Sequence, residues 1–154
     1  MKDNEYIYLL GKLIVAFHGL EFSLRAFLQN QPGVCPMGIP AGTKIYDLPV
    51  GATIPENMFS SYDTLGALIS KYNKVVSALG RPTIDQDLVE LRDALAHGRV
   101  ASMTETGPMN LIKFSKPQNG QVKVVFKEIM DTTWFNTQIS KVNRALWSIQ
   151  NDQS

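Results

Sequence analysis

The chain has 154 residues and a formal net charge of +1, with 15 Lys and Arg residues against 14 Asp and Glu residues. This length favours one domain with a sizeable core, and the near-neutral charge excludes the strongly basic composition typical of many nucleic-acid-binding domains. The single cysteine, Cys35, excludes an internal disulfide framework and fits a reducing cytoplasm. Cys35, His18 and His97 lack the paired spacing of zinc ligands, so we expect no metal and no cofactor.

Residues 4–29 predict one long amphipathic helix rather than a signal peptide, because the charged-then-apolar order of a leader is missing. Charged residues interrupt the apolar stretch, so we expect no membrane span and a cytoplasmic location. Glu21 and Arg25 stand four residues apart, which predicts an ion pair on the helix surface. His18 lies one position off the apolar stripe of this helix, which favours a structural role. The predicted stripe steps by three and four residues through Leu10, Leu13, Phe17, Leu20, Leu24 and Phe27.

Residues 30–57 are rich in proline and glycine, and proline removes a backbone donor and fixes φ. We therefore expect a long loop here. A loop of this length in a compact domain is often functional, and a tolerated insertion is the equally weighted alternative.

Two further helices are predicted in the middle of the chain. Residues 58–79 have an apolar face that includes Met58 and Tyr62, and Gly80 with Pro82 ends that helix. Residues 84–97 follow Thr83 as the predicted N-cap, and Gln86 at the third helical position completes the spacing of a capping box. Ile84, Leu88, Leu91 and Leu95 form the stripe of this helix, and Gly98 suits the position after its end.

Residues 99–127 change to the alternating pattern of strands, with Asn119-Gly120 as a two-residue hairpin turn. Residues 132–150 predict a last helix capped by Asp131. We therefore expect one domain over residues 1–154, mainly α, folded as a four- to five-helix bundle. A small antiparallel β-hairpin or meander is inserted before the last helix.

The most informative residues are Arg92, Asp93 and His97, at the end of the third predicted helix. Histidine titrates near neutral pH and can transfer a proton, whereas arginine keeps its charge and can bind a phosphate with two hydrogen bonds. At 100° per residue, His97 lies roughly 150° from the centre of the apolar stripe, so it faces away from its own core. Two alternatives give these residues a purely structural role. Asp93 and His97 could form an exposed pair four residues apart, or His97 could interact favourably with the dipole at the C-terminal end of the helix.

Arg92 and His97 are about 7.5 Å apart along the helix axis and about 140° apart around it. One protomer would have difficulty directing both at one phosphate. Two copies related by a two-fold axis would bring two such pairs into one cleft, so the motif indicates a homodimer.

The pattern Arg-x4-His at a helix end, with a polar residue after the arginine, resembles the HEPN superfamily. Here the three residues are Arg92, Asp93 and His97, and the run Leu20-Glu21-Phe22-Ser23-Leu24-Arg25 resembles the first helix of that family. Asparagine is the commoner second residue, so Asp93 departs mildly from the pattern. The proline- and glycine-rich loop and the meander have no counterpart that we can match.

The resemblance implies a metal-independent endoribonuclease that works as a homodimer, as a toxin with a cognate antitoxin or as an antiviral-defence effector. It implies His97 as general base or acid, Arg92 as the group that stabilises charge on the phosphate, and Asp93 as the residue that orients them. The expected products are a 2′,3′-cyclic phosphate and a 5′-hydroxyl.

Several basic residues of the meander could hold RNA. Lys123 and Lys127 are expected on one strand face, which would suit phosphate contacts, although lysines also protect edge strands from pairing. The candidate RNA-binding residues are Arg99, Lys113, Lys123 and Lys127. Tyr46, Tyr62 and Tyr72 could stack on bases, and packing in the core or the loop explains them equally well.

Two other functions stay open on the sequence alone. The chain is alternatively a non-catalytic helical interaction or dimerisation module, because fold does not fix function. A weaker alternative is a nucleotide sensor in which Arg92 holds a phosphate.

Overall fold

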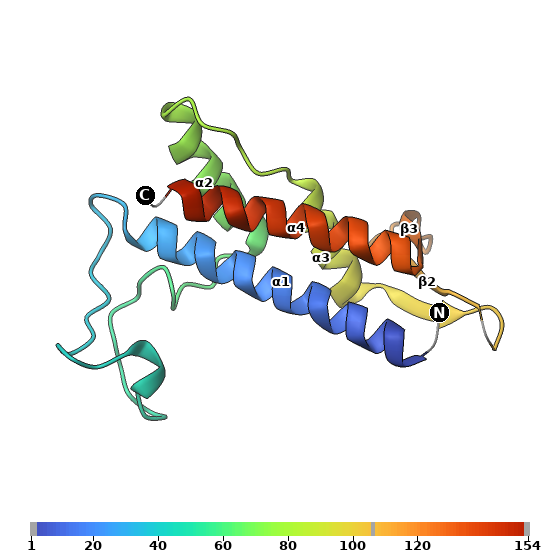
Figure 1. Cartoon of the computed structure of the whole chain (residues 1–154), viewed down its shortest axis with the longest axis horizontal. Helices are drawn as coiled ribbons and strands as arrows, with labels where there is room; N and C mark the ends of the chain where they lie inside the picture. The colour runs from blue at the N-terminus through green and yellow to red at the C-terminus, as the bar shows by residue number, and fades with distance from the viewer. Residues whose placement is uncertain (1–2, 106, 153–154) are drawn as a thin grey trace.

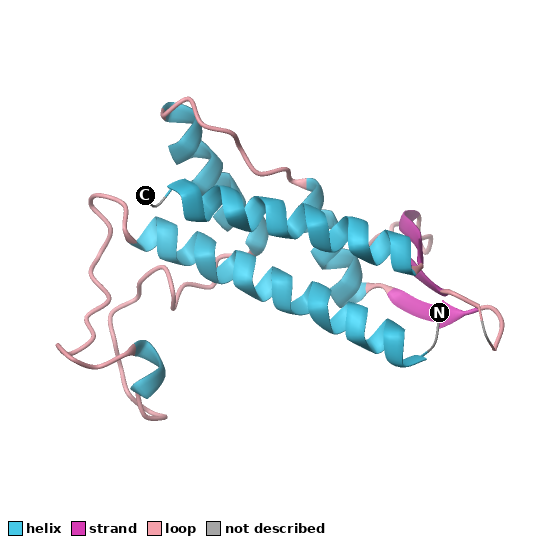
Figure 2. Cartoon of the chain, viewed as in Figure 1, coloured by secondary structure: helices cyan, strands magenta, loops and turns pink. Residues whose placement is uncertain are grey.

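The computed structural model describes residues 3–105 and 107–152. Its elements are, in chain order, α1 (Asp3–Gln29), the 3-10 turn η1 (Ile45–Asp47), α2 (Leu65–Ala78), α3 (Asp87–His97), β1 (Arg99–Ser102), β2 (Met109–Phe114), β3 (Val124–Met130) and α4 (Thr132–Asp152). Figure 2 shows that helices dominate and that the strands gather at one end. The prediction of a mainly α chain with a small antiparallel sheet before the last helix is confirmed.

The four- to five-helix bundle is not confirmed. The long helices α1 and α4 lie side by side and run parallel (Figure 1). Thr132 Oγ1 donates to Glu5 Oε1 at 2.8 Å, near the first turns of both helices, and Gly19 faces Leu146 further along. In a bundle of four helices that alternate up and down, the first and last helices are antiparallel. Here α2 and α3, of 14 and 11 residues, are also much shorter than α1, with 27 residues.

One continuous core joins all four helices to the sheet. The predicted stripe of α1 is buried except for Leu10, which is half-buried, and α4 contributes Phe135, Val142 and Ile149. Phe27 of α1 packs edge-to-face on Tyr72 of α2, with ring centroids 4.9 Å apart. Burial of these aromatic and aliphatic side chains is the main stabilising contribution to the fold.

Helix α1 is long and apolar enough to cross a membrane, by length and composition alone. The same test is passed by the core helices of soluble proteins. In this structure one stripe of α1 is buried against α4 and α2, and the opposite surface exposes Ile7, Ile14, Val15 and Phe22.

The sheet is a meander with the order β1-β2-β3, and both pairings are antiparallel. Leu111 of β2 and Met130 of β3 are fully buried on the face toward the helices. The predicted turn is confirmed, since Asn119 and Gly120 both have positive φ, 52° and 74°. Gln118 and Gln121 exchange two backbone hydrogen bonds across that turn, at 2.8 and 3.0 Å.

The second helix begins at Leu65, later than predicted. Thr64 caps it, because its Oγ1 accepts the Ala67 N–H at 3.3 Å. Met58 and Tyr62 therefore precede the helix. Met58 still packs, partly buried, against the core, whereas Tyr62 is fully exposed. The end of the helix is as predicted: Gly80 has φ 67°, and Arg81 N–H donates to Val76 O at 2.9 Å.

The third helix begins at Asp87, so the predicted start at residue 84 and the Thr83 capping box are wrong. The reason lies in α2. The Asn73 side chain donates to Ile84 O and accepts from Ile84 N–H, both at 2.8 Å, as a neighbouring strand would. Since both backbone groups of Ile84 are bound to Asn73, neither is free for a helix.

Gly98 ends α3, but in an extended conformation with φ −72° rather than the expected left-handed one. A Cβ at this position would collide with the Ala94 carbonyl oxygen and the Leu111 side chain. Glycine is needed here because β2 crosses closely, which places the sheet directly beside the Arg92–His97 motif.

Candidate active site

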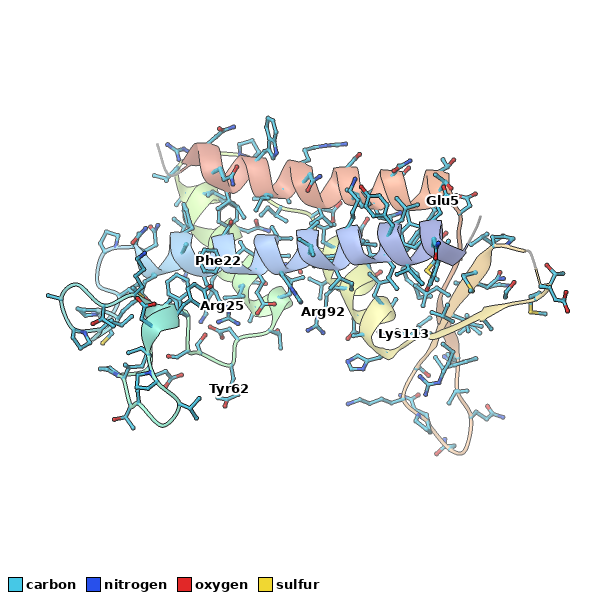
Figure 3. The ribbon with its side chains drawn as sticks, turned by 60° about the horizontal axis from the view of Figure 1, so that its bottom comes forward. Glu5, Phe22, Arg25, Tyr62, Arg92 and Lys113 are labelled. Atoms are coloured by element: carbon cyan, nitrogen blue, oxygen red, sulfur yellow. The ribbon has the colours of Figure 1, made fainter. Side chains whose placement is uncertain are left out.

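Arg92, Asp93 and His97, the three motif residues, line one hollow of about 430 Å³. Arg92, Asp93 and His97 line it from α3, Glu21 and Arg25 line it from α1, and Tyr62 lines it from the segment before α2. We call this the motif hollow. Figure 3 shows Arg92 and Tyr62 projecting on the same side of the molecule. The fold thus brings Arg92 and His97 to one surface within a single protomer, which the helix geometry alone did not predict.

Arg92 is exposed, and it stands between the motif hollow and a neighbouring hollow of about 230 Å³. Within the described residues its guanidinium makes no side-chain hydrogen bond or ion pair, whereas the other cations beside it do. Arg25 pairs with Glu21, and Lys113 pairs with Asp93. Arg92 therefore presents a positive charge to solvent, in a form suited to an anion such as phosphate.

Asp93 connects α3 to the sheet. Its Oδ2 forms an ion pair with Lys113 Nζ from β2, and its Oδ1 lies 3.5 Å from His97 Nε2. The hydrogen bond from Lys113 lowers the pKa of Asp93, and the charges of Lys113, His97 and Arg92 act in the same direction, whereas burial opposes them. Asp93 is thus held as an anion beside His97.

His97 occupies the last position of α3 and its side chain is 67% exposed. The Arg99 guanidinium donates to the His97 carbonyl oxygen at 3.0 Å, so a free carbonyl at the helix end gains a partner. The backbone of His97 is fixed in this way, while its imidazole stays open to solvent. Such a side chain can exchange protons with a bound substrate.

Arg25 holds the segment that leads into α2. Its Nη1 donates to the carbonyl oxygens of Met58 and Ser61, at 2.7 and 3.0 Å, and its Nη2 donates to Asp63 O at 3.0 Å. Nη2 also donates to Glu21 Oε1 at 2.9 Å. The expected surface pair of Glu21 and Arg25 is therefore a partly buried clamp, with the Arg25 side chain only 12% exposed.

The four basic residues predicted to bind RNA do not form one surface. Lys113 faces the helices and pairs with Asp93. Arg99 of β1 and Lys127 of β3 are both cross-strand neighbours of Ile112 in β2, so they lie on the face of the sheet opposite to Lys113. Lys123 precedes β3, which begins at Val124, so Lys123 and Lys127 do not share a strand face as predicted. Of the four, Lys113 contacts a motif side chain, that of Asp93, and Arg99 contacts the backbone carbonyl oxygen of His97.

Sequence reasoning missed three features of this site. The sequence pattern favours Lys113 as an RNA contact, whereas in the structure it pairs with Asp93. The Arg25 clamp looked like an ordinary pair four residues apart on a helix. The periodicity predicts Tyr62 on the apolar face of a helix, whereas it precedes α2 and is fully exposed. Only Tyr62 had a local signal, since Thr64 is a good helix cap that would have placed the start of α2 after it.

His18 is exposed rather than packed in the core, and it lines the hollow on the far side of Arg92 together with Ile14 and Ala96. Among residues 3–105 and 107–152, no group of three or more His, Cys, Asp or Glu side chains is placed to hold a metal ion. No family model, no curated protein and no solved structure matches this chain.

Proposed function

We propose that this chain is a metal-independent endoribonuclease of the HEPN type, in which Arg92 and His97 act on one RNA phosphate. The observation that carries the proposal is the arrangement of the motif hollow. An arginine without an anionic partner in the described part of the chain shares this hollow with an exposed histidine, and an anchored aspartate lies 3.5 Å from that histidine. In this proposal the four helices correspond to those of a HEPN-like bundle.

The proposed reaction needs a base, an acid and a positive charge. The ribose 2′-oxygen forms a bond to the adjacent phosphorus, and the bond from phosphorus to the 5′-oxygen breaks. The 2′-hydroxyl proton passes to a base and the leaving 5′-oxygen takes up a proton, so the products are a 2′,3′-cyclic phosphate and a 5′-hydroxyl. His97 performs one of these proton transfers, and Arg92 stabilises the negative charge that builds on the non-bridging oxygens.

Asp93 supports His97 in this proposal. As an anion fixed by Lys113, it stabilises a positive charge on His97 when that imidazole takes up a proton. Lys113 is then a positioning residue that acts through Asp93, not a phosphate contact. Arg99, Lys123 and Lys127 stay candidates for contacts with the flanking RNA.

The proposed enzyme is a homodimer. Ile7, Ile14, Val15 and Phe22 are exposed along α1, and Ile14 lines the same hollow as Arg92. An exposed apolar surface of this kind favours an interface, and a second copy placed here would cover the motif. A cytoplasmic location belongs to the proposal through the single cysteine. An antitoxin or defence partner, and a role in toxicity or antiviral defence, belong to it through the family resemblance.

The same apolar surface favours a second candidate function, a non-catalytic interaction module. In that case the exposed stripe of α1 and the Arg92–His97 surface together bind a protein partner. The two candidates differ in whether the protein turns over RNA.

The experiment that separates them is incubation of a mixed RNA pool with the wild type and with His97→Ala, in excess EDTA. The ribonuclease proposal expects cleavage by the wild type and a loss of about 10²–10⁴-fold in His97→Ala. Because His97 is exposed, the variant is expected to fold as the wild type does. Cleavage by both proteins at the same rate would contradict the proposal, and no cleavage by a folded wild-type dimer would favour the interaction module.

A further inference from the structure

Tyr62 is a fully exposed aromatic side chain at the rim of the motif hollow. Its ring projects from the ribbon on the same side as Arg92 (Figure 3). A tyrosine ring that stays in water gains nothing from hydrophobic burial, so its position on this rim is not explained by the fold. Of the two other tyrosines that the sequence offers for base stacking, Tyr72 is fully buried, and Tyr46 is exposed on another hollow, beside Phe22 and Phe59.

The backbone on both sides of Tyr62 is fixed, although its ring is free. The Arg25 guanidinium binds the carbonyl oxygens of Ser61 and Asp63, each at 3.0 Å. The Asp63 carboxylate accepts from Ser61 Oγ at 3.1 Å and from Lys71 Nζ of α2 at 2.7 Å. Because its two neighbours are held in this way, Tyr62 can present its ring at a set position and lose little backbone freedom on binding.

We propose that Tyr62 is the stacking platform for an unpaired base of the RNA, next to the phosphate that Arg92 and His97 engage. This inference rests on the proposed ribonuclease function and specifies its substrate class as single-stranded RNA. In an A-form duplex the base faces are already stacked on each other, so an aromatic side chain reaches them only in loops, bulges and single strands. Every base has an aromatic face, so the platform selects for unpaired bases rather than for a sequence.

The direct test measures binding without turnover. A short labelled single-stranded RNA of mixed sequence is titrated with the full-length His97→Ala protein, and with the same protein carrying Tyr62→Ala, Tyr62→Phe or Tyr8→Ala. Tyr8 is an exposed tyrosine of α1 that does not line the motif hollow, so it is the matched control. Tyr62→Ala is expected to raise the dissociation constant about 5- to 150-fold, the range of base–aromatic stacking. Tyr62→Phe and Tyr8→Ala are expected to bind as the parent does.

A duplex RNA of the same sequence completes the design. Its affinity is expected to be lower than that of the single strand and to be unaffected by Tyr62→Ala. The inference is overturned if Tyr62→Ala binds the single strand as tightly as the parent, or if the loss is equal for duplex and single strand.

Failure of this inference can be told apart from failure of the proposed function. If the wild type cleaves RNA in EDTA while Tyr62→Ala binds and cleaves as the wild type does, only the stacking role is wrong. If the wild type neither binds nor cleaves RNA, the ribonuclease proposal is wrong, and the role of Tyr62 falls with it. Rescue of both binding and cleavage by Tyr62→Trp would support stacking over a purely structural role, because tryptophan keeps an aromatic face and lacks the hydroxyl.

Discussion

Lys113 of β2 forms an ion pair with Asp93 of α3, the residue between Arg92 and the rest of the motif. The partners are 20 residues apart in the sequence and lie on a strand and a helix. The meander is thus more than a surface addition, because its Lys113 lowers the pKa of Asp93, the residue next to Arg92 and close to His97.

Replacing Lys113 by methionine is expected to raise the pKa of Asp93 toward its usual value, since the strongest cause of its lowering is removed. Asp93 is 41% exposed, so the loss of stability should be small, about 0.2–1 kcal/mol. Cleavage should decrease, with its acid limb shifted to higher pH. The shift of the acid limb is measured by comparing the pH–rate profile of Lys113→Met with that of Lys74→Met, in which an exposed lysine of α2 is replaced as the control. Identical profiles would remove Lys113 from the site.

Arg92→Gln is expected to reduce cleavage about 10²–10³-fold, because glutamine lacks the charge that stabilises the transferring phosphate. The free energy of unfolding should stay within about 0.5 kcal/mol of the wild type, since the Arg92 side chain is exposed and without a side-chain partner among the described residues. Arg144→Gln, an exposed arginine of α4 away from the motif hollow, is the matched control. Equal rates for the two variants would contradict a role for Arg92.

Arg25→Met is expected to lower the free energy of unfolding. It leaves the carbonyl oxygens of Met58, Ser61 and Asp63 without their donor, and the Glu21 carboxylate without its partner. Loss of hydrogen bonds to a charged group of this kind costs about 1.5–3 kcal/mol. Urea denaturation would detect this loss, and limited proteolysis should show earlier cutting within residues 30–64. A variant as stable as Arg144→Met would argue against the clamp.

Acid should weaken the Asp63–Lys71 pair. The hydrogen bond from Lys71 lowers the pKa of Asp63 below its usual value of 3.8, with further lowering from Ser61 and from the charges of Lys71 and Arg25. A carboxylate with a lowered folded-state pKa stabilises the fold above its unfolded-state pKa, and this contribution is lost as the pH falls through the folded-state pKa. Asp63→Asn should therefore be less stable than the wild type at neutral pH and should lose that deficit in acid. A deficit that does not change with pH would contradict this cause.

The long elements were predictable from the sequence because each one carries its own signal. The stripe from Leu13 to Phe27 is buried as expected, Asp131 caps α4 through the Trp134 N–H at 2.7 Å, and the Asn119-Gly120 turn forms. These features depend on residues close together in the chain, where periodicity and capping decide the outcome.

What could not be predicted depends on contacts between distant residues. Asn73 holds Ile84 extended and so moves the start of α3. The parallel arrangement of α1 and α4 has no local signal. At the candidate site, the sequence predicted Arg92, Asp93 and His97 as site residues on a polar surface. The residues packed around them, Lys113 bound to Asp93 and Arg25 bound to the segment before α2, come from other elements.

The most direct test of the proposed chemistry is end-group analysis by mass spectrometry of a defined single-stranded RNA incubated with the wild type in excess EDTA. The same digest is run with His97→Ala and with an all-deoxy copy of the oligonucleotide. The proposed mechanism predicts 2′,3′-cyclic phosphate and 5′-hydroxyl ends from the wild type alone, and an intact deoxy strand, because the attacking group is the ribose 2′-hydroxyl. Cleavage of the deoxy strand, or the same cyclic phosphate ends from His97→Ala at the wild-type rate, would contradict it.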